Sequence, residues 1–364
     1  MLQKTINVLV VDDSSLFRKL IIDYLSSCPD INVVGSAINA YDARRKIPLL
    51  KPDVMTLDVE MPGLNGIEFL KELLPVHPIP VLLVSSLNLN VFDALSAGAV
   101  DFVRKPDMTA VSKEAFFSAL NSKIHIASFA KIKRSATRTV GTSPAPAPKM
   151  PVFSGKLNTP RSTVIALGAS TGGTEATLAV LRQLPADIPG MVVTQHMPEG
   201  FTAMYAQRLN KLCRMEVREA KNGDQIRPGL VLIAPGSQQM EVIRTANGYA
   251  VRCFSGEKVS GHMPSVDVLF RSVAKNVTGN KVGIIMTGMG KDGAEGLLEM
   301  RRKGAYTIGQ DKASCVVYGM PMVAYNIGAV AIQAACENIP SVLLNHLKKL
   351  SLSLIHISEP TRRV

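Results

Sequence analysis

The sequence predicts an α/β chain of two doubly wound parallel-sheet domains joined by a flexible basic linker. In both halves, short apolar runs end in polar side chains and alternate with helix-like stretches. Continuous apolar strands that alternate with helices are typical of parallel sheets with helical crossovers. A proline-rich stretch separates the two halves, and the length of 364 residues suits two or three domains.

The net charge of +12 first raises the class of nucleic-acid-binding proteins. Much of the excess lies in residues 131–161, which hold seven basic and no acidic side chains among five prolines. This segment lacks interleaved aromatic residues and any groove-reading motif. We therefore interpret it as a solvated tether and expect no nucleic-acid partner.

Other classes are excluded by what the sequence lacks. No apolar run reaches the roughly 18 residues of a membrane span, and the N-terminal stretch has no signal-peptide pattern. The five cysteines form no CxxC pair, so neither a zinc site nor a disulfide framework is indicated. We expect a cytoplasmic protein without membrane insertion.

The N-terminal half carries a cluster of polar residues at the ends of its predicted strands. The predicted strands are residues 6–11, 54–57, 81–84 and 99–103, with helices at 15–25 and 66–74. The polar residues that follow these strands are Asp12, Asp13, Asp58, Ser85 and Lys105. The carboxyl ends of parallel strands meet in one crevice. Crowded carboxylates favour Mg²⁺, and a lysine and a hydroxyl can hold phosphoryl oxygens, so the set suits phosphoryl transfer onto an aspartate rather than plain capping of strand ends.

The motifs VVDDSS, LDVEMPGLNG, VSS and DFVRKP resemble the receiver domain of two-component response regulators. The resemblance implies a flavodoxin-like fold with Asp58 as the phosphoacceptor and a histidine kinase as the phosphodonor. The Mg²⁺ ligands that it implies are Asp12, Asp13, Asp58 and the backbone carbonyl of Glu60. The switch and phosphate-contacting residues that it implies are Ser85, Phe102 and Lys105. The stretch from Ser86 to Gly98 is a few residues shorter than is usual in this family.

The C-terminal half begins with a serine on a glycine-rich turn. A strand-like run at 163–168 leads into GASTGG and then into a helical stretch. Glycines around Ser170 let the backbone turn sharply and expose the hydroxyl, and N–H groups at the helix start favour negative charge. The motif alone allows a nucleophile, a phosphate-binding turn or a plain tight turn.

A nucleophilic serine needs a base and an acid that orients the base. His196 follows the strand-like MVVTQ and is expected at the same sheet edge as Ser170. His262, in the polar stretch SGHMPSVD, is the rival base. Asp292 follows the strand-like VGIIMT in a second glycine-rich turn. Together, Ser170, His196 and Asp292 predict hydrolytic acyl chemistry.

The C-terminal half resembles the catalytic domain of the chemotaxis-specific protein-glutamate methylesterase family. The resemblance rests on IALGASTGGTEA, TQHMPEGFT, RLNKLC, IAPG, PSVDVLF, TGMGKDGAEG and ASCVVYGMP. It implies a serine hydrolase with Ser170 as nucleophile, His196 as base, Asp292 as orienting carboxylate and the backbone around Met289 as an oxyanion donor. The implied substrates are methylated glutamates of chemoreceptors, and receptor glutamines for deamidation, with no cofactor for the esterase chemistry. The order Ser, His, Asp differs from that of α/β-hydrolases, so we expect a Rossmann-like α/β/α sandwich.

The expected domain boundaries follow these motifs. They are a receiver domain at 1–125, a Pro/Ala/Lys linker at 126–161, a methylesterase domain at 162–350 and a non-native or disordered tail at 352–364. Two departures from the family pattern lie near the expected rim of the active site. Met263 stands where the family usually has an arginine, and Met322-Val323 replaces a charged pair.

The two-domain pattern also predicts a form of regulation and allows two rival functions. We hypothesise that the receiver covers the Ser170 cleft of a monomer until Asp58 is phosphorylated. A transcriptional response regulator would instead carry a small helix-turn-helix output domain, unlike the alternating pattern after residue 160. A nucleotide-binding module would use GASTGG as a phosphate cradle, but the Lys-Ser/Thr of a P-loop is missing. The positive charge of the C-terminal half favours an acidic receptor surface.

Overall fold

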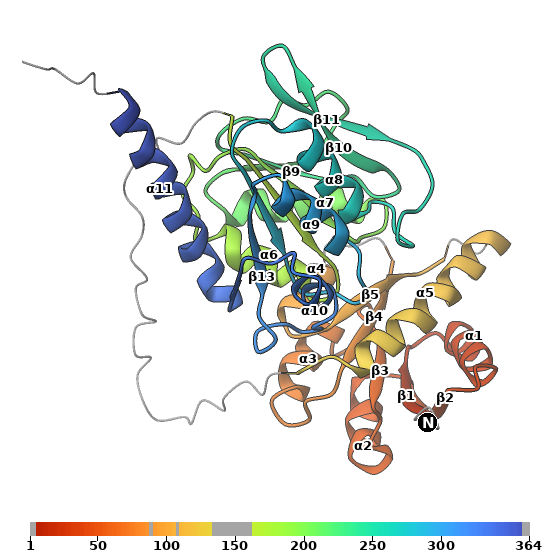
Figure 1. Cartoon of the computed structure of the whole chain (residues 1–364). Helices are drawn as coiled ribbons and strands as arrows, with labels where there is room; N and C mark the ends of the chain where they lie inside the picture. Colours follow the sequence, from red (N-terminus) through yellow and green to blue (C-terminus); the bar gives the residue numbers. More distant parts are fainter. Residues whose placement is uncertain (1–4, 87–89, 107–108, 133–161, 359–364) are drawn as a thin grey trace, which may run out of the picture. The chain divides into compact units, whose positions relative to one another are not determined.

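A computed structural model describes residues 5–86, 90–106, 109–132 and 162–358. The chain divides into two compact units, Met1–Ala145 and Pro146–Val364. Figure 1 draws the first in red to yellow and the second in green to blue. Most of the expected linker lies outside the described residues. Within the described residues, no helix combines the length and the apolar character that crossing a bilayer requires.

The first unit is built around a five-stranded parallel sheet. Its strands are β1 (Ile6–Val11), β2 (Ile31–Ala37), β3 (Val54–Asp58), β4 (Val81–Ser85) and β5 (Asp101–Arg104). They pair in the order β2-β1-β3-β4-β5. This is the order of flavodoxin-like domains, with a switch point between β1 and β3. The predicted fold class of this half is confirmed.

Helices cover both faces of this sheet. They are α1 (Ser15–Ser26), α2 (Ala40–Leu50), α3 (Gly66–Leu73), α4 (Asn90–Ser96) and α5 (Ala110–Ser128). Short polar side chains begin several of them, as at α3, where the Asn65 side chain accepts from the N–H groups of Ile67 and Glu68. On one face α1 contacts α5, with Tyr24 stacked on Phe117 at 4.4 Å between ring centroids. On the other face α3 contacts α2 and α4.

The second unit holds a seven-stranded parallel sheet and a separate two-stranded hairpin. The sheet strands are β6 (Val164–Ala169), β7 (Met191–Gln195), β8 (Glu216–Glu219), β9 (Leu230–Ile233), β12 (Lys281–Ile285), β13 (Tyr306–Gln310) and β14 (Ile332–Ala334). Their order is β14-β13-β12-β6-β7-β9-β8. The hairpin pairs β10 (Gln239–Thr245) with β11 (Gly248–Phe254). The order reverses at β6, which lies between β7 and β12, and such switch points are where doubly wound sheets bind ligands.

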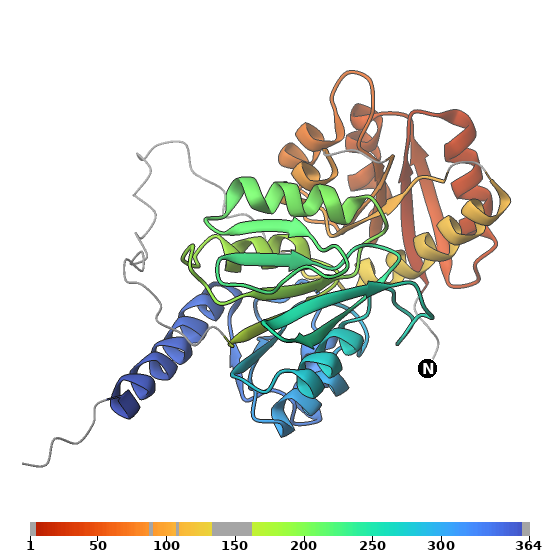
Figure 2. The ribbon, with the colours of Figure 1, turned by 90° about the horizontal axis from the view of Figure 1, so that it is seen from above.

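Helices also cover both faces of the second sheet (Figure 2). They are α6 (Gly173–Leu181), α7 (Phe201–Leu212), α8 (Val266–Asn276), α9 (Ala294–Arg302), α10 (Met320–Asn326), the 3₁₀ turn η1 (Cys336–Asn338) and α11 (Ile339–Ser358). α6 contacts α7 and α11, whereas α9 contacts α8 and α10. The result is the expected α/β/α sandwich, and it is not the small helical output domain of a transcriptional regulator.

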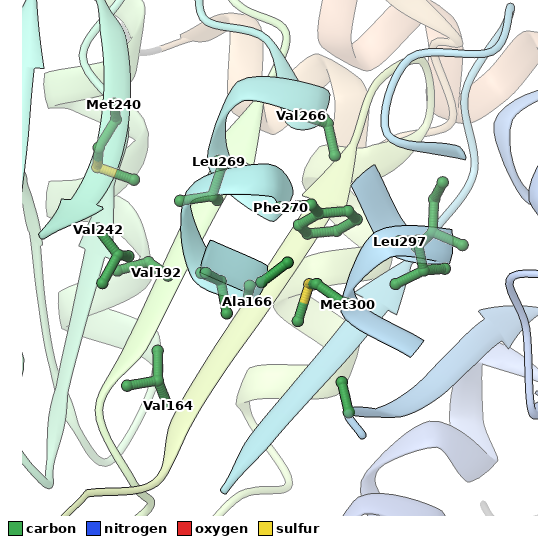
Figure 3. Close-up of a cluster of buried hydrophobic side chains, with 14 of the residues drawn as sticks. Val164, Ala166, Val192, Met240, Val242, Val266, Leu269, Phe270, Leu297 and Met300 are labelled. Atoms are coloured by element: carbon green, nitrogen blue, oxygen red, sulfur yellow. The ribbon is translucent and has the colours of Figure 1, made fainter. Parts of the chain in front are cut away.

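An apolar cluster fixes α8 between the sheet and the hairpin (Figure 3). Leu269 and Phe270 on α8 are fully buried, and Met240 and Val242 of β10 pack in the same cluster. Burial of one such side chain stabilises the fold by about 2 kcal/mol. This packing matters for function because the N-terminal end of α8 meets the candidate active site.

The backbone differs from the sequence-based expectations at strand β2, at the hairpin β10–β11 and at the ends of two helices. Strand β2 at the edge of the first sheet was not predicted, because INVVGSA shows neither a continuous apolar run nor a polar residue at its end. Helix α5 continues to Ser128, past the boundary expected at 125, since Ala127 in its last turn is buried. Helix α11 continues through Ser358, into the segment expected to be disordered, and 359–364 lie outside the described residues.

Candidate active sites

The polar residues predicted at the strand ends of the first unit converge in one pocket. Asp12 follows β1 and Asp58 ends β3, and both are buried. Ligand oxygens of Asp12, Asp13 and Asp58 lie within 4.8 Å of one another. The Lys105 ammonium lies 2.6 Å from Asp58 Oδ2 and 3.1 Å from Asp12 Oδ2. The predicted acidic pocket is therefore present in the fold.

Burial dominates the electrostatics of this pocket. It raises the pKa of Asp12 and of Asp58 above the usual carboxyl value, although Lys105 acts in the opposite direction. Burial alone would lower the pKa of Lys105, but its contacts with Asp58 and Asp12 raise that pKa above its ordinary value. One ammonium cannot balance three neighbouring carboxylates. The donor set therefore fits a divalent cation that prefers oxygen ligands.

The other predicted receiver residues lie on, or directly after, strands β3, β4 and β5. Ser85, one position beyond the register partner of Asp58, is fully buried, and its Oγ has no hydrogen-bond partner among the described residues. Such an orphan hydroxyl costs about 1–3 kcal/mol and is a donor suited to a phosphoryl oxygen. Phe102 is buried on β5. The Glu60 N–H donates to Asp58 Oδ1 at 3.0 Å, while the Glu60 side chain is exposed.

Ser170 lies in the second unit, on the turn between β6 and α6. Its N–H donates to the Thr287 carbonyl at 2.9 Å, and its own carbonyl accepts from Gly173 N–H at 2.7 Å. Gly172 in this turn has φ +76°, and a Cβ there would lie 2.6 Å from Val316 Cβ. A side chain at 172 would therefore be both strained and obstructed. The turn holds the half-buried Ser170 at the carboxyl end of a central strand.

His196 lies at the end of the neighbouring strand β7 and contacts a carboxylate. Its backbone N–H donates to the Ala169 carbonyl at 3.1 Å, next to Ser170. Its Nε2 lies 2.8 Å from Asp292 Oδ2, and its side chain is only 8% exposed. When Nε2–H donates to this carboxylate, Nδ1 carries the lone pair. Nδ1 is buried and has no hydrogen-bond partner in the part of the chain that is described, so it is placed to accept a proton.

Asp292 is held by the N-terminal end of α8. Its Oδ1 accepts from Ser265 Oγ at 2.7 Å and from Asp267 N–H at 3.0 Å. Its Oδ2 accepts from Val266 N–H at 2.7 Å in addition to His196. Burial alone would raise the pKa of Asp292, but these donors and His196 hold it below the usual carboxyl value. A charged, oriented carboxylate therefore faces the histidine.

The loop that contains Met289 lies against Ser170. A Cβ on Gly288 would lie 2.6 Å from Ser170 Cβ, so this approach requires glycine. The Gly288 carbonyl accepts from Met320 N–H at 2.8 Å, which ties the loop to the start of α10. Met289 follows directly and is 37% exposed. Its backbone is thus beside the serine, where a donor to an oxyanion would act.

His262, the rival base, lies on the face of His196. The two rings are nearly parallel, with 3.7 Å between centroids and 11° between planes. A stacked ring presents its face and not a ring nitrogen to its neighbour. Because His196 has the 2.8 Å contact to Asp292, the geometry favours His196 as the base.

The two departures from the family pattern lie in different environments. Met263 is half-buried next to His262. Met322 on α10 is 41% exposed, whereas its neighbour Val323 packs against the apolar cluster of the second unit. The pair therefore combines one surface methionine and one core contact.

Several groups that build this site were not predicted as functional. They are Ser265, the N–H groups of Val266 and Asp267, and Gln239. His262 was predicted as a rival base and not as a ring stacked on His196. A signal existed for Ser265, since a serine before the apolar run VDVLF is typical of a helix N-cap. Backbone donors carry no side-chain signal, so a sequence does not reveal them.

The two folds and their polar groups define a class of protein. It joins an acidic, phosphoacceptor-type domain to an α/β domain with a serine, a histidine and an aspartate around the switch point of its sheet. Comparison with known families agrees with this class. The response regulator receiver domain family matches residues 8–115, and the CheB methylesterase family matches residues 165–343.

Full-length relatives extend the match across both units. A protein-glutamate methylesterase/protein-glutamine glutaminase 2 of Syntrophomonas wolfei is 51% identical over 95% of this chain and 99% of its own length. One of Syntrophotalea carbinolica is 51% identical over 89% of this chain and 93% of its own. The solved CheB methylesterase catalytic domain of Thermotoga maritima is 32% identical, covering 50% of this chain and 97% of that domain, with a TM-score of 0.49. The chain belongs to the CheB family of receiver-linked protein-glutamate methylesterases, which confirms the resemblance seen in its motifs.

Proposed function

We propose that this chain is a phosphorylation-activated hydrolase that removes methyl esters from glutamates of chemoreceptors and deamidates receptor glutamines to glutamate. The observation that carries the proposal is the contact of His196 Nε2 with Asp292 at 2.8 Å, beside Ser170. Family membership supports the substrate, because the relatives are named for these two activities.

In the proposed mechanism, Ser170 Oγ attacks the carbonyl carbon of the ester while His196 Nδ1 takes the hydroxyl proton. The Asp292 carboxylate holds the imidazole by its Nε2–H and stabilises the imidazolium that forms. The developing oxyanion is held by backbone donors around Met289, and one such donor contributes about 3–4 kcal/mol to the stability of the transition state.

The tetrahedral intermediate then collapses. His196 returns the proton to the leaving oxygen, so methanol departs and an acyl-enzyme on Ser170 remains. Water, deprotonated by His196, hydrolyses that ester and restores the Ser170 hydroxyl. An amide substrate follows the same route and releases ammonia, which explains how one site serves both activities.

The pocket of the first unit is the proposed regulatory site, with Asp58 as phosphoacceptor. Asp12, Asp13, Asp58 and the Glu60 carbonyl would hold Mg²⁺, which supplies charge neutralisation for phosphoryl transfer when bound. The buried Ser85 hydroxyl and the Lys105 ammonium would bind phosphoryl oxygens. Phe102 would be the switch aromatic residue, which changes its position together with Ser85. The proposed phosphodonor is the chemotaxis histidine kinase, and the reaction takes place at the cytoplasmic helices of the receptors.

The test measures products from receptor membranes. With Mg²⁺ and a small-molecule phosphodonor, the full chain should release methanol from methylated receptors and ammonia from receptors that carry glutamine. Ser351→Ala, which removes a hydrogen bond to the Leu347 carbonyl on α11, is the control for Ser170→Ala and should match the unaltered chain. Release of neither product by the unaltered chain would refute the proposed function.

A further inference from the structure

The reaction proposed for Ser170, His196 and Asp292 does not explain why the ring of His262 stacks on that of His196. His262 lies face to face with His196, at 3.7 Å between ring centroids and 11° between ring planes. The hydrogen bond of His196 to Asp292 runs along the edge of its ring. The face contact with His262 therefore leaves both nitrogens of His196 available for Asp292 and Ser170.

The backbone that carries His262 is built for one position. Val259 and His262 exchange both backbone hydrogen bonds, at 2.9 and 3.0 Å, around a tight turn. The two central residues, Ser260 and Gly261, have φ values of +52° and +82°. This is the pattern of a type I′ turn, and a serine in the left-handed region is uncommon. Such a turn fixes the direction of the residue that follows it.

Two side-chain contacts connect this turn to the catalytic carboxylate. The buried Gln239 donates to the His262 carbonyl at 3.2 Å and accepts from Ser265 N–H at 2.8 Å. Ser260 Oγ donates to Asp267 Oδ2 at 3.2 Å, and Asp267 N–H donates to Asp292 at 3.0 Å. The N-terminal end of α8 therefore sets the positions of both His262 and Asp292 relative to His196.

We propose that His262 is a positioning residue for the reaction, and that its ring face holds the His196 imidazole in the orientation that joins Asp292 to Ser170. The inference rests on the proposed function. His262 takes no proton from the substrate or from Ser170 in this account, so a flat ring without nitrogens can replace it.

The kinetic test compares three variants of the full chain under activating conditions. His262→Leu, which keeps bulk but removes the ring face, should lower kcat for methanol release by about ten- to hundredfold with KM within about twofold, since misorientation of a catalytic group costs this much. His262→Phe should stay within about threefold of the unaltered chain. The matched control is His346→Leu, which removes a ring stacked on Tyr306 at the amino end of β13. This variant should leave kcat and KM unchanged.

A spectroscopic readout separates this inference from the proposed function. The ring-current shift of the His196 Cε1–H NMR signal should be lost in His262→Leu and retained in His262→Phe, whether or not the receptor is a substrate. The inference fails if His262→Leu keeps the kcat of an active unaltered chain, or if His262→Phe is as inactive as His196→Ala, which would make His262 the base. An inactive unaltered chain with the predicted NMR shifts would refute the proposed function alone.

Discussion

At the scale of single residues, the second unit keeps a carboxylate both buried and charged. Asp292 is 1% exposed, and its donors are Ser265 Oγ, the N–H groups of Val266 and Asp267, and His196 Nε2. Asp267 is the neighbouring carboxyl group, and its pKa is shifted in the opposite direction. Burial raises the pKa of Asp267 above the usual value, and the Asp292 charge adds to this rise. The environment thus selects Asp292 as the charged partner of His196.

Asp292→Asn tests this selection. An asparagine side chain has one acceptor oxygen and one NH₂ donor, whereas the carboxylate has two acceptor oxygens. If the NH₂ group faces His196 Nε2, the imidazole takes the other tautomer and Nδ1 no longer carries the lone pair. We expect kcat for methanol release to fall by about 10⁴-fold. Glu241→Gln, at an exposed ion pair with Arg252 on the hairpin, is the matched control. Activity of Asp292→Asn within tenfold of the control would contradict the assigned role.

At the scale of elements, two turns bring the reacting groups together. The turn after β6 carries Ser170, and the loop after β12 approaches it so closely that a Cβ on Gly288 would lie 2.6 Å from Ser170 Cβ. Both belong to glycine-rich motifs because the backbone needs positive φ or close approach there. Helix α8 supplies the third part, since its first N–H groups bind Asp292 and the apolar cluster behind it fixes its position.

The turn after β6, which carries Ser170, predicts that two glycine substitutions differ in their effect on activity. Gly172 and Gly304 have φ values of +76° and +81°, so alanine at either site is strained by about 1–2 kcal/mol. A Cβ at 172 would also lie 2.6 Å from Val316, whereas nothing lies within 4 Å at 304. We expect Gly172→Ala to lower methanol release at least tenfold and Gly304→Ala to lower only the free energy of unfolding. Equal activity in the two variants would show that the turn does not position Ser170.

An ion pair near the hairpin gives a pH-dependent prediction. Burial would raise the pKa of Asp224, but the Arg218 guanidinium, at 2.5 Å, holds that pKa below the ordinary carboxyl value. A lowered pKa in the folded state stabilises the fold above the unfolded pKa, and this contribution is lost as pH falls through the folded value. We expect Asp224→Asn to reduce the free energy of unfolding by about 1 kcal/mol near neutral pH. Urea titrations should show that the difference in the free energy of unfolding between Asp224→Asn and the unaltered chain shrinks only below about pH 5. A difference that grows in acid would contradict the assigned role of this ion pair.

Sequence patterns predicted the elements whose role is chemical better than those whose role is structural. The strands that end in Asp12, Asp58, Ser170 and His196 were predicted because an apolar run stops at a polar residue. Strand β2 and the hairpin β10–β11 were not predicted, since they end in no such residue. The sequence favoured His196 over its rival His262 through the family resemblance alone, because the 2.8 Å contact of His196 with Asp292 joins residues far apart in the chain.

At the scale of the whole molecule, two compact units divide regulation from chemistry. The acidic pocket lies within Met1–Ala145, and Ser170, His196 and Asp292 lie within Pro146–Val364. Each unit has its own parallel sheet and core, so each is expected to keep its fold without the other. Covalent linkage of two such units suits control of one by the phosphorylation of the other.

Residues 150–351 alone should therefore turn over methylated receptors faster than the unphosphorylated full chain. The reason is the proposed regulation, in which the receiver biases the chain toward an inactive state until Asp58 carries a phosphoryl group. Asp58→Asn should abolish activation of the full chain by a phosphodonor with Mg²⁺. Asp42→Asn, at an ion pair with Lys46 outside the pocket, is the control and should still be activated. A fragment no faster than the unphosphorylated chain would contradict inhibition by the receiver.

The most direct test of the account is the rate of methanol release from methylated receptor membranes by Ser170→Ala, beside the unaltered chain, both in the full-length, phosphorylated form. The serine mechanism predicts a fall of at least about 10⁴-fold, because the acyl-enzyme has no oxygen on which to form. Thermal unfolding measured on both chains should show an intact fold. Methanol release that persists in a folded Ser170→Ala chain would contradict the serine mechanism.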